Sequence, residues 1–202
     1  MIAIIDYGMG NLRSVQKAFE FLGENAVVTS EKRILKDASH IVLPGVGAIS
    51  DALTNLDKRG LADEIQKQAN SGKPFLGICL GLQLMLDKSY ENGEFSCLSL
   101  IPGNVVPFRL DKRLFRVPHM GWNSLIAGDN ALFSNNDGEQ FVYFVHSYHA
   151  DGVPEECVIG RADYGYSFTC AIRKENMYGL QFHPEKSGDI GLRMLKKFAQ
   201  LK

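Results

Sequence analysis

One cysteine in this sequence occupies a setting that could make it a nucleophile. Residues 73–83 are KPFLGICLGLQ, an apolar run that meets Cys79 and continues into a helix-compatible segment. We therefore expect a strand that turns sharply into a helix at Cys79. Gly77 and Gly81 suit such a turn, because larger side chains there would collide with it. The positive end of the following helix would favour the thiolate over the thiol.

A histidine and a glutamate near the C-terminus could serve that cysteine. Residues 181–185 are QFHPE, and Pro184 argues against a helix through this point. In an extended chain His183 and Glu185, two residues apart, would face the same side. The carboxylate would fix the tautomer of the imidazole and stabilise its charged form, while the other ring nitrogen faced the thiol. Cys79, His183 and Glu185 are thus candidates for nucleophile, base and orienting acid.

A glycine-rich turn could supply backbone amides that stabilise an oxyanion. Residues 44–47 are PGVG and follow the apolar run 41–43. In a parallel sheet the loops after the strands form the ligand-binding edge, where Cys79 is also expected. A developing oxyanion needs two backbone amide donors. The candidates are the amide of Leu80 and that of Val46 or Gly47, although a Pro-Gly turn by itself is equally well explained as a plain connection.

Each feature has a simpler interpretation when taken alone. A single cysteine after an apolar strand is more often a small buried hydrophobe. The remaining cysteines have no matching turn, and we interpret them as unreactive: Cys97, Cys157 and Cys170. The remaining histidines form no convincing metal-binding pattern and are individually better explained as structural: His40, His119, His146 and His149. No metal or cofactor is expected.

The first half of the chain alternates between strand and helix patterns. Apolar runs predict strands at 2–5, 26–28, 41–43 and 75–78. Helical spacing is present at 12–22, after a glycine-rich turn at 6–11, and again at 50–70 with a break near Gly60. This alternation predicts an α/β fold, a three-layer open and mostly parallel sheet with helices on both faces.

The second half has shorter strand patterns separated by turns. Strands are predicted at 104–108, 141–145, 157–160, 168–173 and 177–182, with turn signals at 128–130 and 135–138. They predict an antiparallel extension of the sheet, and a helix at 190–201 ends the chain. With no low-complexity linker or internal repeat, we expect a single domain, 1–202.

Composition limits the classes of function. The chain has 202 residues, 45% of them hydrophobic, and a net charge of -1. Such a balance gives no reason to expect nucleic acid or an anionic membrane as a partner. Four scattered cysteines argue against a disulfide framework. No apolar run approaches the roughly 18 residues of a membrane span, so a cytoplasmic protein is expected.

Taken together, the motifs at 77–83, 44–47 and 181–185 resemble those of the class I, or triad, glutamine amidotransferases. Residues 6–12, 118–123 and 143–148 further look like the glutaminase subunits of imidazole glycerol phosphate synthases. The resemblance implies hydrolysis of L-glutamine through a cysteinyl thioester. It also implies a heterodimer with a (β/α)8-barrel cyclase, which uses the ammonia to make imidazole glycerol phosphate and AICAR in histidine biosynthesis.

The resemblance also implies residues that bind the substrate and the partner. Gln83 follows Cys79 by four residues, so both fall on one helix face, and a polar side chain there needs a partner. The substrate-binding candidates are Gly45, Gln83, Glu91 for the ammonium group, and the backbone of His146, Ser147 and Tyr148. Trp122, expected in a turn-like segment, is typical of an interface anchor. The partner-facing candidates are Asn11, Trp122, Tyr143 and Lys186.

Three other functions stay open at this point. The chain could be a class I glutaminase that serves a different synthase, such as one in nucleotide-sugar or pyridoxal phosphate assembly. It could be a free-standing cysteine hydrolase on the same fold. It could also be a non-catalytic subunit, although the intact Cys79, His183 and Glu185 argue against that.

Overall fold

A computed structural model describes residues 1–111, 113–134 and 139–202, so the turn expected at 135–138 lies outside the described residues. The first half contains β1 (Ile2–Ile5), α1 (Leu12–Phe21), β2 (Ala26–Thr29), α2 (Lys32–Asp37), β3 (His40–Gly45), α3 (Ile49–Lys58), α4 (Ala62–Ala69), β4 (Phe75–Cys79) and α5 (Leu80–Met85). The second half contains β5 (Lys88–Ser89), β6 (Phe95–Ser96), β7 (Asn104–Pro107), β8 (His119–Leu125), β9 (Gln140–His146), β10 (Tyr148–Asp151), η2 (Glu155–Cys157), β11 (Val158–Asp163), β12 (Ser167–Lys174), β13 (Met177–Leu180), η3 (Pro184–Lys186) and α6 (Gly188–Ala199).

A parallel group of strands brings the motif around Cys79 next to the motif around His183. Its order is β2-β1-β3-β4-β13, so the strand nearest the C-terminus lies directly beside the strand that ends at Cys79. In the register of that pair, Gly179 lies opposite Gly77 and Leu180 opposite Ile78. Because the two strands are parallel, the chain leaves both at the same edge of the sheet. The loop that carries His183 therefore emerges next to Cys79.

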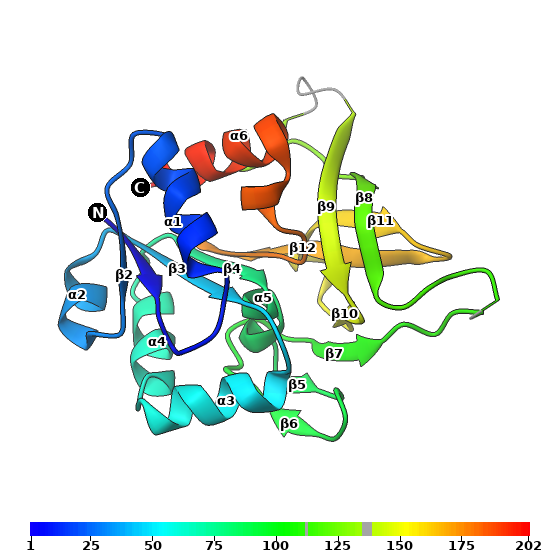
Figure 1. Cartoon of the computed structure of the whole chain (residues 1–202), viewed down its shortest axis with the longest axis horizontal. Coiled ribbons are helices and arrows are strands. Elements are labelled where there is room, and N and C mark those ends of the chain that lie inside the picture. The colour runs from blue at the N-terminus through cyan, green and yellow to red at the C-terminus, as the bar shows by residue number, and fades with distance from the viewer. Residues whose placement is uncertain (112, 135–138) are drawn as a thin grey trace.

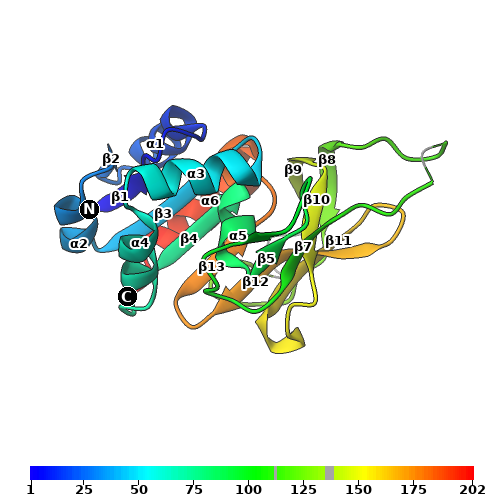
Figure 2. The ribbon, with the colours of Figure 1, turned by 90° about the horizontal axis from the view of Figure 1, so that it is seen from below.

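Helices cover both faces of these strands, as Figures 1 and 2 show. Alternate side chains of β1 point to opposite faces, and so join two different hydrophobic clusters. Ala3 and Ile5 pack in the cluster that contains α3, α4 and α5. Ile2 and Ile4 pack in the cluster that contains α1 and α6. The predicted α/β class, with a mostly parallel sheet between helical layers, is confirmed.

The predicted extension of the sheet begins at β12, and its strand pairs are antiparallel except for the parallel pair of β5 with β7. From β13 the sheet continues through β12, β10, β7, β5 and β6, while β11 pairs with residues 167–172 of β12. A separate two-stranded sheet, β8 with β9, lies beside this extension, and in its register His119 faces His146 and Trp122 faces Tyr143. In Figure 1 these two strands stand at the end of the molecule away from the N-terminus.

Several local predictions differ from the structure, which also contains the unpredicted strands β5, β6 and β10. Residues 119–125, expected to be turn-like around Trp122, form strand β8. Gly121 and Asn123 are poor strand formers, so they obscure the alternation of apolar and polar residues that would predict a strand. Pairing with β9 nevertheless holds this segment as a strand. The six-residue helix α2 was not predicted, because it is too short to display a clear period. The predicted break near Gly60 is confirmed, since α3 ends at Lys58 and α4 begins at Ala62.

No helix in the described part of the chain is long and apolar enough to cross a membrane.

Candidate active site

Cys79 occupies a strained turn between β4 and α5. Its φ of 55° and ψ of -107° lie in a region that non-glycine residues avoid, at a cost on the order of 1–3 kcal/mol. A Cβ at position 81 would lie 1.8 Å from the carbonyl oxygen of Leu43, and one at position 77 would lie 2.8 Å from the backbone of Gly81. The expected need for glycine on both sides of Cys79 is confirmed.

His183 and Glu185 meet, but not through an extended chain. Nδ1 of His183 lies 2.8 Å from Oε1 of Glu185, and both side chains are 1% exposed. The prediction of an extended segment is wrong, because residues 184–186 form the short 3-10 helix η3. Its tight turn, which starts at Pro184, carries the carboxylate back toward the ring.

Hydrogen bonds to β9 hold the histidine backbone in place. The amide of His183 donates to the carbonyl of Tyr143 at 2.9 Å. The hydroxyl of Ser187 donates to the carbonyl of His183 at 2.6 Å and accepts from the amide of Tyr143 at 3.0 Å. The ring is thus fixed by its backbone as well as by the carboxylate.

The surroundings of His183 favour its protonated form. Burial opposes the charge, but interactions with Cys79 and Glu185 outweigh it and raise the pKa of His183. Nδ1 is engaged by Glu185, and Nε2 is buried without a hydrogen-bond partner among the described residues, so Nε2 is the nitrogen left to exchange a proton with a thiol. Such a histidine can act as a base toward a nearby thiol.

The other three cysteines lie where burial disfavours a charged sulfur. Burial raises the pKa of Cys97 to about 12, and it also raises the pKa values of Cys157 and Cys170. Desolvation disfavours a charged sulfur, so these three residues stay as unreactive thiols near neutral pH. The contrast singles out Cys79, which faces a histidine.

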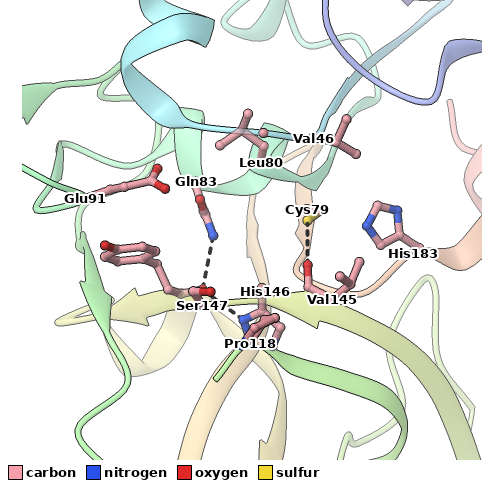
Figure 3. Close-up of a pocket in the computed structure, with 12 residues that line it drawn as sticks. Val46, Cys79, Leu80, Gln83, Glu91, Pro118, Val145, His146, Ser147 and His183 are labelled. Atoms are coloured by element: carbon pink, nitrogen blue, oxygen red, sulfur yellow. Dashed lines mark hydrogen bonds between the residues drawn. The ribbon is translucent and has the colours of Figure 1, made fainter. Parts of the chain in front are cut away.

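A cavity of about 290 Å³ collects most of the candidate residues (Figure 3). The volume suits a small polar molecule of amino-acid size. Its walls contain Val46, Gly47, Cys79, Leu80, Gln83, Glu91, Pro118, Val145, His146, Ser147, Tyr148 and His183. Of the predicted substrate-binding residues only Gly45 is not part of this lining. A Cβ there would lie 2.4 Å from the Tyr7 hydroxyl and 2.8 Å from Leu80, so Gly45 instead allows the loop to approach the turn at Cys79.

Polar groups in the cavity are themselves anchored. The carboxylate of Glu91 accepts a hydrogen bond from the amide of Ile49 at 2.8 Å, at the start of α3. The side-chain amide of Gln83 donates to the carbonyl of Tyr148 at 3.1 Å. A ligand would therefore meet an acid and an amide whose positions are set in advance.

The sequence motifs did not identify two groups that contact the sulfur. The carbonyl oxygen of Val145 lies 3.9 Å from Sγ of Cys79, and Nε2 of Gln181 lies 3.7 Å from it. The first can accept a hydrogen bond from the thiol, and the second can donate a hydrogen bond to a thiolate. Gln181 is fully buried within an apolar run, and a buried polar side chain needs a partner. A polar residue within an apolar run was the only feature of the sequence that could have indicated Gln181. Val145 contributes its backbone carbonyl, which no feature of the sequence indicates.

Three of the four partner-facing candidates form one surface cluster. Trp122 is 57% exposed, and its ring lies 6.1 Å from that of Tyr143. Nζ of Lys186 lies 5.9 Å from the centre of the Tyr143 ring. Asn11 instead precedes α1, where it accepts a hydrogen bond from the hydroxyl of Ser14 at 2.8 Å. An exposed tryptophan beside a tyrosine is typical of a surface that binds another protein.

Comparison with known proteins agrees with this arrangement. The family model for class I glutamine amidotransferases matches residues 3–201. A solved glutamine amidotransferase superposes with a TM-score of 0.77 at 19% identity, over 98% of this chain and 100% of that one. The structure of PurLQS from Thermotoga maritima gives a TM-score of 0.75 at 20% identity, over 98% of this chain and 96% of that one. Those structures show the shared fold, and the family match shows that the chain is a class I glutamine amidotransferase.

Full-length relatives narrow the assignment. The imidazole glycerol phosphate synthase subunit HisH of Sulfurimonas denitrificans is 48% identical, over 99% of this chain and 98% of its own length. The HisH subunit of Caldanaerobacter subterraneus is 45% identical, over 100% of this chain and 98% of its own length. The chain belongs to the family of HisH subunits of imidazole glycerol phosphate synthase.

Proposed function

We propose that this cavity hydrolyses L-glutamine, with Cys79 as nucleophile, His183 as general base and acid, and Glu185 as the group that orients the imidazole. The observation that carries the proposal is the buried contact between His183 and Glu185 at the cavity that holds the Cys79 sulfur. A thiol, an imidazole and a carboxylate in this relation suit acyl transfer.

The proposed reaction has two acyl-transfer steps. The sulfur of Cys79 attacks the side-chain amide carbon of glutamine while His183 takes the thiol proton. Amides of Leu80 and of Val46 or Gly47 stabilise the oxyanion, an interaction worth about 3 kcal/mol per donor. His183 then protonates the leaving nitrogen, ammonia departs, and a γ-glutamyl thioester remains. Water, deprotonated by His183, attacks the thioester carbon, and glutamate and the Cys79 thiol are released.

The other residues at the cavity would hold the substrate. Glu91 can pair with the ammonium group of glutamine, and the backbone of His146, Ser147 and Tyr148 can bind its amino-acid end. Gln83 is proposed to contact the substrate from the helix that Cys79 begins. The cavity places these groups around the same volume as the nucleophile.

The ammonia is proposed to pass to a (β/α)8-barrel cyclase that makes imidazole glycerol phosphate and AICAR in histidine biosynthesis. Support comes from the family, whose members are subunits of imidazole glycerol phosphate synthase. The whole chain, 1–202, would act as one amidotransferase domain in a cytoplasmic heterodimer. Trp122, Tyr143, Lys186 and Asn11 would face the cyclase.

We expect the isolated chain to hydrolyse glutamine slowly and its complex with the cyclase to do so much faster, because uncoupled ammonia would be lost. The measurement is glutamate release by the chain alone, with the cyclase, and with the cyclase and its nucleotide ligand. The expected increase is at least about 100-fold, which corresponds to about 3 kcal/mol of coupling.

A barrel from an unrelated pathway serves as the control and should leave the rate unchanged. Full glutaminase activity without any partner would contradict the proposal and favour a free-standing hydrolase. Activation by a different synthase, but not by the cyclase, would show that the chain functions in another pathway.

A further inference from the structure

Two buried histidines outside the triad form a chain of hydrogen bonds that ends at the substrate cavity. His119 of β8 and His146 of β9 face each other in the strand register, with Nδ1 of the first 3.0 Å from Nε2 of the second. Nδ1 of His146 lies 2.8 Å from the carbonyl oxygen of Tyr148. At the other end, the side-chain amide nitrogen of Asn123 lies 3.3 Å from Nε2 of His119.

The partners at the two ends fix the direction of every bond. A carbonyl can only accept, so His146 carries its proton on Nδ1 and its Nε2 is an acceptor. His119 must then donate from Nδ1, which leaves its Nε2 to accept from Asn123. Each ring thus holds one proton and is neutral. Burial acts in the same direction, since it lowers the pKa of His119 to about 4 and that of His146 to about 3.

At the cavity the chain continues through the Tyr148 carbonyl to Gln83. That oxygen also accepts from Nε2 of Gln83 at 3.1 Å, and the same nitrogen lies 3.2 Å from Oε1 of Gln181. Both amide hydrogens of Gln83 are therefore used within the protein. If the side-chain amide of Gln83 were rotated by 180°, its oxygen would face the Tyr148 carbonyl oxygen, and two acceptors cannot form a hydrogen bond. Only Oε1 of Gln83 therefore remains for a ligand.

We propose that His119 and His146 are positioning residues, whose hydrogen-bond relay holds the Tyr148 carbonyl and commits Gln83 to present its oxygen to the substrate. The relay is defined here as Asn123, His119, His146, the Tyr148 carbonyl and Gln83. The inference rests on the proposed glutaminase function. It specifies that Gln83 accepts from an N–H group of glutamine, and that this point of the cavity does not receive the carboxylate.

The packing around His119 allows its hydrogen bonds to be removed without a cavity. Its ring is stacked between those of Phe144, 4.7 Å away, and Tyr164, 4.0 Å away. His119→Phe retains an aromatic ring in this stack and loses both hydrogen bonds. His119→Asn keeps an amide donor close to the place of Nδ1, and so is the matched variant that can restore the bond to His146.

The kinetic test uses glutamine turnover by the complex with its cyclase. We expect His119→Phe to raise the KM for glutamine by about tenfold, the equivalent of one lost hydrogen bond, with kcat changed by less than about threefold. His119→Asn is expected to return the KM to within about threefold of the unsubstituted complex. An unchanged KM in His119→Phe, or an equal loss in both variants, would overturn the relay.

A second measurement needs no substitution. Nitrogen-15 spectra of the histidine rings at pH 7 are expected to show His119 and His146 both neutral and both protonated on Nδ1. A charged ring, or a proton on Nε2 of either residue, would overturn the proposal. If the complex failed to hydrolyse glutamine, the proposed function would be wrong, and these spectra would still decide whether the relay exists.

Discussion

We expect Cys79→Ala to abolish glutamine-driven synthesis by the complex while synthesis from added ammonium salts continues. Alanine cannot form a thioester, so the glutamine-dependent rate should fall by a factor on the order of 10⁴ or more. The cyclase does not need this cysteine when ammonia is supplied directly. The measurement is product formation with each nitrogen source, under otherwise identical conditions.

Cys157→Ala is the matched control for that substitution. Cys157 is also buried, but it lies away from the cavity lining and its thiol pKa is raised. It should therefore leave both activities unchanged. Survival of glutamine-driven synthesis in Cys79→Ala would show that the nucleophile is a different residue. Loss of both activities would indicate a general structural defect or a broken complex.

The second large effect is expected from Glu185→Gln. The carboxylate accepts from Nδ1 of His183 at 2.8 Å, whereas an amide could turn its nitrogen to the ring and stabilise the wrong tautomer. We expect kcat for glutamine to fall by a factor on the order of 10³–10⁴, as in hydrolases that lose the equivalent carboxylate. Ammonia-driven synthesis should remain. Steady-state kinetics of both reactions provide the measurement.

The same variant should change the pH dependence in a defined direction. Glu185 is one of the groups that raise the pKa of His183, so its replacement removes part of that increase. The imidazolium then loses its proton at lower pH, so the limb of the kcat/KM profile that reports the titration of His183 should move to lower pH. Glu31→Gln, at an exposed position, should leave the profile unchanged. A shift to higher pH, or full activity, would contradict the assigned role of Glu185.

The sequence predicted those parts of the site that depend on local geometry. The turn at Cys79 follows from an apolar strand, two glycines and a helix, all within a few residues. The alternating elements of the first half predicted the parallel sheet, which places the loops after β3 and β4 at one edge. His183 and Glu185 were identified from their chemistry, although the turn that joins them was expected to be extended.

The parts that were missed depend on contacts between distant segments. His119 and His146 were interpreted separately, because only the pairing of β8 with β9 brings them together. No role could be predicted for Gln181, because only the pairing of β13 with β4 brings its side-chain amide to the Cys79 sulfur. Val145 contributes a backbone carbonyl, and no residue type encodes such a contribution.

The most direct test of the account is to trap the covalent intermediate. The complex is mixed with L-glutamine, quenched with acid during turnover, digested and analysed by mass spectrometry. We predict a γ-glutamyl adduct on the peptide that contains Cys79, and on no other cysteine peptide, with none in Cys79→Ala. An adduct on another residue during active turnover would contradict the central claim that Cys79 is the nucleophile of glutamine hydrolysis.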